Sequence, residues 1–228
     1  MWDRRGWQNL IHFEFMLKGS VLGPMVICGV CFTKLNLDTL SEIGVKDSKK
    51  LSPQKRKNLA EIIKKNCNSY KIIEVTAQEI DEREQKKISL NRLEELKMAE
   101  IVNNLKPDVI YIDAADVNEK RFGISIKKLL NYNPKNIISK HRADDIYPIV
   151  SAGSIIAKDR RDFLIEEIHK KYGNFGSGYP SDPRTIKFLR DYIKKYKKAP
   201  GIARKTWDTT KKIINEEVSN KKITEFFS

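Results

Sequence analysis

The sequence has few cysteines, and this scarcity excludes a disulfide-stabilised protein. Only three cysteines stand among 228 residues, too few for a framework of bridges. Cys28 and Cys31 form a CxxC pair inside the apolar run MVICGVCF. Residues three apart in a strand point to opposite faces, and no second cysteine pair is present to complete a zinc site. We therefore interpret these cysteines as buried thiols of a reducing cytoplasm rather than a redox or metal site.

Long apolar runs are also absent. No stretch approaches the roughly 20 apolar residues that a membrane-spanning helix needs. Near the N-terminus, Arg4 and Arg5 precede a mildly apolar stretch, but charged residues interrupt it and no small-residue cleavage site follows. We expect a cytoplasmic protein without a membrane partner.

Acidic residues are in deficit. The chain has 44 Lys and Arg against 30 Asp and Glu, a formal net charge of +14. Such an excess favours a polyanionic partner, because neutralised phosphates release condensed counterions. The alternative is that the lysines only provide solubility. The length suits one large domain, or one domain with a helical appendage, and we expect a monomer.

Strand-like and helix-like patterns alternate, which indicates an α/β layer architecture. The predicted strands cover residues 21–33, 70–77 and 109–113. The predicted helices cover residues 53–66 and 93–105, a long stretch ending at 173, a stretch starting at 182 and a last one around 207. Ser52 and Pro53 give the first of these helices a clear start, as an N-cap residue followed by proline at the first helical position.

Two acidic positions are candidates for chemistry. Asp113 ends an apolar strand, where α/β sheets hold their reactive groups. Asp144 and Asp145 precede a helix in HRADDIYP. Turn or helix-capping roles explain such residues equally well. If the chain brings them together beside a phosphate, they form a site for Mg²⁺ or Mn²⁺, which prefer carboxylate oxygen.

Longer motifs narrow the function. KGSVLGPMV, GVKDSKKLS, YIDAADVN, HRADDIYPIVSAGSIIAKDRRD and YGNFGSGYPSDPRTIKFL occur in this order. Together they closely resemble type 2 ribonuclease H, especially its archaeal form, from about Lys18 to Trp207. The resemblance implies an RNase H-like mixed sheet flanked by helices, with a helical C-terminal portion. We expect a catalytic domain over residues 1–180, the helical portion over 181–215 and a tail over 216–228.

The resemblance also implies an activity: Mg²⁺- or Mn²⁺-dependent cleavage of RNA in RNA/DNA hybrids and of ribonucleotides embedded in duplex DNA. It makes Asp113 and Asp144 metal ligands. Tyr179 is expected to stack at the ribonucleotide–deoxyribonucleotide junction and to help sense the 2′-hydroxyl, which separates RNA from DNA. Lys46 and Lys158 are expected near the phosphates. The alternatives are a helix-capping aromatic for Tyr179 and solvated surface for either lysine.

One block of the family pattern is disrupted. The family's first strand ends in GIDEAGRG, whose Asp and Glu bind metal and whose GRG loop contacts the ribonucleotide. Aligned without gaps, this chain offers Glu14 for the Asp, Phe15 for the Glu, and a loop containing Lys18 and Gly19 for the GRG. A phenylalanine cannot coordinate a cation, so the site keeps at most three of the four carboxylates.

Two explanations of the disruption stay open. With suitable synonymous codons, Met1–Gln8 read one base later encodes Cys-Gly-Ile-Asp-Glu-Ala-Gly, so a frameshift, a sequencing error or a faulty gene start accounts for it. Alternatively, LIHFEF replaces the family strand and Glu14 takes the Asp position. The protein is then a catalytically impaired nucleic-acid-binding remnant with weak or absent cleavage.

The tail contains NKKITEFF, which resembles a sliding-clamp-binding peptide. Ile223, Phe226 and Phe227 are in register with its aliphatic and aromatic positions, while Asn220 replaces the usual Gln. On one helical turn these three side chains form an apolar plug for a hydrophobic groove. The alternative is that the terminal Phe pair packs on its own domain.

Overall fold

The computed structural model describes residues 9–16, 19–33, 36–45 and 51–219. The chain forms two compact units. Unit 1 combines Met1–Met16, Val26–Glu74 and Asn91–Arg161, and unit 2 combines Leu17–Met25, Val75–Leu90 and Asp162–Ser228. This division separates parts of the chain that pack within themselves, and it does not mark functional domains. The functional boundaries expected at residues 180 and 215 stay a prediction.

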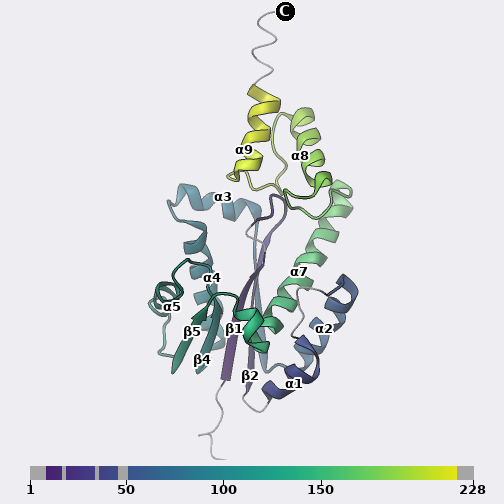
Figure 1. Cartoon of the computed structure of the whole chain (residues 1–228). Helices are drawn as coiled ribbons and strands as arrows, with labels where there is room; N and C mark the ends of the chain where they lie inside the picture. The colour runs from purple at the N-terminus through teal and green to yellow at the C-terminus, as the bar shows by residue number, and fades with distance from the viewer. Residues whose placement is uncertain (1–8, 17–18, 34–35, 46–50, 220–228) are drawn as a thin grey trace, which may run out of the picture. The chain divides into compact units, whose positions relative to one another are not determined.

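Unit 1 contains a five-stranded mixed sheet with the order β3-β2-β1-β4-β5 (Figure 1). Its strands are β1 (Asn9–Met16), β2 (Met25–Thr33), β3 (Ser69–Val75), β4 (Val109–Asp113) and β5 (Asn136–Lys140). β1 pairs antiparallel with β2 and parallel with β4, and β4 pairs parallel with β5. The prediction of an α/β fold with a mixed sheet is confirmed.

Unit 1 contains several helices. They are α1 (Leu37–Glu42), α2 (Pro53–Asn66), α4 (Leu90–Leu105), α5 (Glu119–Lys127) and α6 (Ala143–Ile146). α2 has the predicted bounds, and its N-cap Ser52 accepts a hydrogen bond from the Lys55 amide. α5 lies against β5, where a side chain added at Gly123 would come within 3.1 Å of Ser139. Glycine therefore permits this close helix–strand contact.

Unit 2 is built from helices around a separate apolar core. It contains α3 (Ala77–Gln85), α8 (Pro183–Tyr196), α9 (Asp208–Ile214) and η4 (Asn215–Ser219), together with the C-terminal part of α7 (Pro148–Tyr172). The buried core comprises Val21, Leu22, Ile165, Phe175, Leu189, Ile193, Ala199, Ala203 and Ile213. α8 starts at the predicted Asp182-Pro183 pair, and Asp182 caps it by accepting from the Arg184 amide.

The first predicted strand is too long by four residues. β2 starts at Met25, whereas Val21 and Leu22 belong to unit 2. Leu22 forms a bridge with Ala203 there, and Gly23 has a φ of 86° that no regular strand adopts. Asp144 precedes the long helix α7, as expected, but it also lies inside a one-turn helix, α6, that the sequence did not predict.

The cysteines of β2 are free thiols, as predicted. Cys28 and Cys31 are both buried. Burial raises the pKa of Cys31 to about 11, so the thiol stays protonated and unreactive at neutral pH. Within the described ranges, no helix is both long and apolar enough to cross a bilayer. The expected cytoplasmic location stays a prediction.

Candidate active site

A hydrogen bond joins Asp113 to the residue directly before Asp144. Asp113 is the last residue of β4, and its Oδ1 accepts from the backbone N–H of Ala143 at 3.1 Å. Asp144 is the next residue, and only 7% of its surface is exposed. Two acidic positions from distant parts of the sequence therefore lie at the same end of the parallel strands.

The short helix α6 is fixed from both sides. It starts after Arg142, whose left-handed backbone (φ 53°) turns the chain away from β5. The Ser151 hydroxyl donates to the Asp144 carbonyl at 2.6 Å. The rings of Tyr111 on β4 and Tyr147 lie 4.8 Å apart. Burial, and then the neighbouring Tyr147, raise the pKa of Tyr111, so this contact is between neutral rings.

The loop after Asp113 has its own ion pair, which sequence reasoning missed. Asp116 is 9% exposed, and each of its oxygens lies 2.6 Å from Arg121 Nη2. It also accepts from the Asn118 amide at 2.9 Å. The Asp116 carboxylate raises the pKa of Arg121. The motif YIDAADVN contains both Asp113 and Asp116. In the sequence, only the position of Asp113 at the end of the apolar strand distinguishes it as the site candidate.

A second carboxylate ties β5 to α5. Glu119 accepts from the His141 amide at 2.7 Å and from Lys140 Nζ at 3.4 Å. The His141 amide, followed by Lys140, lowers the pKa of Glu119. Glu119 therefore holds the chain at the point where β5 leads into α6.

Glu14 occupies a position level with Asp113. β1 and β4 pair in parallel as far as Phe13 and Ile112, so Glu14 and Asp113 follow on neighbouring strands. This backbone register agrees with the ungapped assignment of Glu14, whose side chain lies outside the described part. Among the side chains that are described, no group of three or more His, Cys, Asp or Glu forms a metal cluster.

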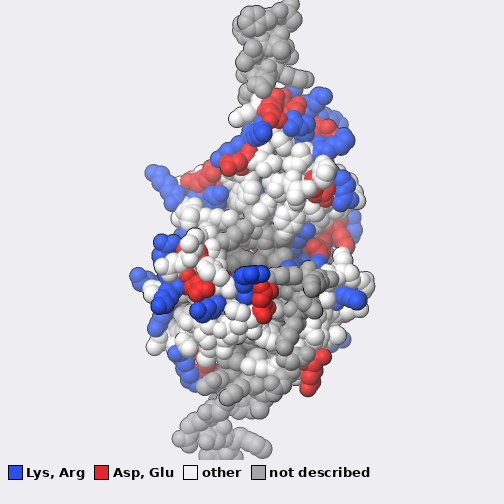
Figure 2. Space-filling view, in the orientation of Figure 1, with Lys and Arg blue, Asp and Glu red and all other residues white. Residues whose placement is uncertain are grey.

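Of the three lysines predicted to contact substrate, the structure describes Lys158. Lys158 lies in α7 within unit 1 and is half-buried. Lys18 and Lys46 lie outside the described residues. On the face shown in Figure 2, Lys and Arg side chains stand among Asp and Glu side chains and do not merge into one basic patch. The roles of all three lysines stay predictions.

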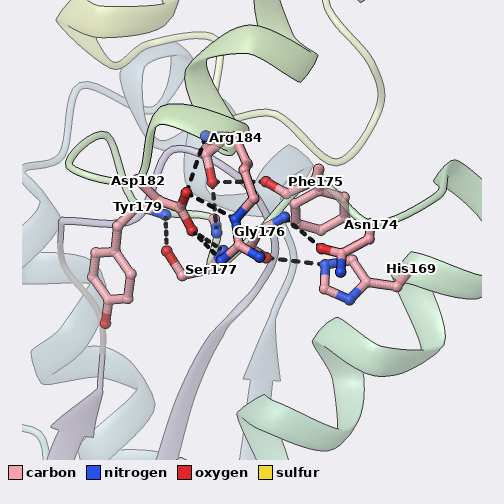
Figure 3. A network of polar contacts seen from close by, with 10 residues as sticks. His169, Asn174, Phe175, Gly176, Ser177, Tyr179, Asp182 and Arg184 are labelled. Carbon is pink, nitrogen blue, oxygen red and sulfur yellow. Dashed lines mark hydrogen bonds and ion pairs between the residues drawn. The ribbon is translucent and has the colours of Figure 1, made fainter.

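Tyr179 belongs to a separate group of residues in unit 2. It lies in the loop between α7 and α8, beside a polar network centred on Asp182 (Figure 3). Asp182 accepts from the Ser177 amide at 2.8 Å and from the Arg184 amide at 3.0 Å. The Arg184 guanidinium, and then the Ser177 amide, hold the pKa of Asp182 well below its usual range. The Tyr179 ring points away from this network (Figure 3).

Gly19 precedes a segment that is hydrogen-bonded to this loop. The Gly178 carbonyl accepts from the amides of Val21 at 2.8 Å and Leu22 at 3.1 Å. Gly178 directly precedes Tyr179, and Val21 follows Gly19 by two residues. Two of the predicted substrate-binding positions therefore lie on segments that are joined by backbone hydrogen bonds.

Comparison with known sequences identifies a family. The profile described as Ribonuclease HII matches residues 18–210. Ribonuclease HII of Pyrococcus furiosus is 48% identical over 207 residues, covering 90% of each chain. Ribonuclease HII of Methanocella arvoryzae is 48% identical over 198 residues, covering 86% of this chain and 88% of that protein. The profile match begins within the disrupted block, after Glu14 and Phe15.

Solved structures agree with this result. The crystal structure of ribonuclease H2 from Pyrococcus horikoshii is similar with a TM-score of 0.86 and 44% identity, covering 91% of this chain and 98% of that one. The structure of the PCNA:RNase HII complex from Archaeoglobus fulgidus has a similar chain, with a TM-score of 0.80 and 37% identity, covering 87% and 95%.

The loop network predicts a specific difference between two glycines. Gly176 and Gly173 both have left-handed backbones, with φ of 82° and 78°. A Cβ at Gly176 would collide with the Asp182 carboxylate, whereas one at Gly173 meets nothing within 4 Å. Each substitution to Ala should cost about 1–2 kcal/mol of backbone strain, and Gly176→Ala should cost at least about 1 kcal/mol more. Urea unfolding measures both, and equal losses would contradict the packed carboxylate.

Proposed function

The chain belongs to the ribonuclease HII family, and we propose that it is a divalent-metal-dependent endonuclease for RNA in RNA/DNA hybrids and for ribonucleotides embedded in duplex DNA. The family hydrolyses RNA in RNA/DNA hybrids. The hydrogen bond from the Ala143 amide to Asp113 supports the proposal most directly, because it joins the two acidic segments. Cleavage is expected to leave a 3′-hydroxyl and a 5′-phosphate.

The donor set suits Mg²⁺ or Mn²⁺. Asp113 and Asp144 supply hard carboxylate oxygens from adjacent elements, and such ions bind substrate phosphates as well. Ions held there would supply activation of the attacking water and stabilisation of the leaving oxygen. We propose Asp113, Asp144 and Glu14 as the residues that hold them.

The chain's own groups orient the acids and the substrate. The Ala143 amide restrains the Asp113 carboxylate, and Ser151 restrains the backbone at Asp144. Holding ligands in place before substrate binds lowers the reorganisation needed during reaction. We propose that Lys18, Lys46 and Lys158 contact phosphates and that Gly19 and Tyr179 contact the ribonucleotide.

A catalytically impaired remnant is the second candidate. Phe15 stands where the family has its Glu, and the profile match starts only at residue 18. With one carboxylate fewer, the cation charge is less neutralised, so duplex binding through the basic excess would outlast cleavage.

Removing either described acid tests the proposed site. With Mn²⁺ and a duplex containing one ribonucleotide, Asp113→Asn and Asp144→Asn should each reduce nicking at that position by at least about 100-fold. Asp108→Asn is a matched control, because Asp108 precedes β4 and pairs with Lys135 at 3.2 Å. Gel assays with a 5′-labelled strand measure the rates. Unchanged nicking in both site variants would refute the assignment.

Restoring the acidic pair separates the two candidates. The double variant Glu14→Asp/Phe15→Glu returns the fourth carboxylate, so its nicking rate should exceed that of the unaltered chain by at least about tenfold. Glu14→Asp alone is the control, since it leaves Phe15 in place. A fully active unaltered chain with no gain in the double variant would exclude the remnant.

We also propose a sliding-clamp partner. The similar Archaeoglobus fulgidus structure is that of a PCNA:RNase HII complex. In this chain Ile223, Phe226 and Phe227, which match the clamp-binding peptide, lie outside the described residues. The aromatic pair suits insertion into an apolar groove.

Shortening the tail tests this partner. Deleting Phe226–Ser228 removes the aromatic plug, so calorimetric titration should show at least about 100-fold weaker clamp binding. Nicking and melting temperature should not change, and Glu225→Ala should retain clamp binding. A lower melting temperature with intact clamp binding would show that the Phe pair packs on its own domain.

A further inference from the structure

The backbone is held on both sides of Tyr179. Residues 175–178 precede it, residues 182–185 follow it, and two side chains from the second group bind the first. These side chains are Asp182, which is 13% exposed, and Thr185, which is fully buried. The Tyr179 side chain points away from them (Figure 3).

Asp182 binds the loop through both its carboxylate and its amide. Besides accepting from the Ser177 and Arg184 amides, it accepts from Arg184 Nη2 at 3.1 Å. Its own amide donates to the Tyr179 carbonyl at 3.1 Å. Gly176 leaves room for this carboxylate, and the Gly176 carbonyl accepts from His169 Nε2 at 2.9 Å. One aspartate therefore closes the turn that contains Tyr179.

Thr185 makes the second connection. Its hydroxyl donates to the Phe175 carbonyl at 2.9 Å and accepts from the Gly178 amide at 3.0 Å. Both bonds are buried, where an unmade hydrogen bond is costly. The Gly178 carbonyl is in turn held by the Val21 and Leu22 amides. The residue directly before Tyr179 is thus fixed through both its N–H and its C=O.

We infer that Asp182 and Thr185 are positioning residues that orient Tyr179 before substrate binds, and so set how strongly the protein distinguishes a ribonucleotide from a deoxyribonucleotide. The inference rests on the proposed function, in which Tyr179 contacts the ribonucleotide. An aromatic ring on a closed loop loses little conformational freedom on binding, and this preorganisation strengthens recognition.

Binding without catalysis provides the test. Fluorescence anisotropy in EDTA gives the dissociation constants for an all-DNA duplex and for the same duplex with one ribonucleotide. The dissociation constant for the all-DNA duplex divided by that for the ribonucleotide-containing duplex measures the discrimination. Asp182→Asn and Thr185→Val should each lower this ratio by about tenfold. In a Tyr179→Ala background neither should lower it further, whereas Thr185→Ser, which keeps the hydroxyl, should preserve it.

The controls separate positioning from general stability. Asp191→Asn makes the same charge change on the exposed side of α8, where Asp191 pairs with Lys187 at 2.6 Å, and should leave the ratio unchanged. A ratio that falls equally with and without Tyr179 would reduce Asp182 and Thr185 to supports of the fold and overturn the inference.

Two further outcomes differ in what they reject. If the unaltered protein discriminates but Asp182→Asn and Thr185→Val discriminate equally well, the inference fails and the proposed function stands. If the unaltered protein shows no discrimination, the proposed ribonucleotide recognition fails, and the inference fails with it.

Discussion

The hydrogen bond between the Ala143 amide and the Asp113 carboxylate is the constraint on which the rest of the site depends. It holds the segments of two acids, each of which suits a turn or a helix start, together at the carboxyl end of the parallel strands β4 and β5. The surrounding contacts reinforce it: Ser151 holds the backbone at Asp144, and Glu119 holds the segment that leads into α6. A metal-binding arrangement needs such support, because free carboxylates close together repel one another.

In unit 2 the interactions at the proposed site are hydrogen bonds to the backbone and not a group of acidic side chains. There the polar groups that matter are mostly backbone amides and carbonyls, and Asp182 and Thr185 complete their hydrogen bonds. The acidic group of unit 1 is suited to charge and cation chemistry. The closed loop of unit 2 is suited to presenting one aromatic ring. Under the proposed function, catalysis and ribonucleotide recognition therefore have separate structural bases within one chain.

Local signals in the sequence predicted much of this organisation. α2 and β4 have the expected bounds, because a cap followed by proline and a short apolar strand are unambiguous patterns. Asp113 was a candidate from its place at the end of a strand and Asp144 from the acidic pair in HRADDIYP, and the family resemblance implied a metal-binding role for both. The predicted start of β2 was wrong because Val21 and Leu22 form hydrogen bonds with a distant segment, at Gly178, and Gly23 then turns the chain with a positive φ. The sequence pattern does not reveal these contacts. The Thr185 and Arg121 contacts also depend on turns that no periodic pattern reveals.

The central place of β1 has a consequence for synthesis of the protein. β1 needs β2 on one side and β4 on the other, and β4 follows β2 by some distance along the chain. Until the ribosome has released Val109–Asp113, the nascent sheet exposes one unsatisfied edge of β1, which can pair with a strand of another chain. We therefore expect the rate at which the ribosome translates residues 34–108, and chaperones that cover that edge, to influence how much of the newly made protein reaches its native state.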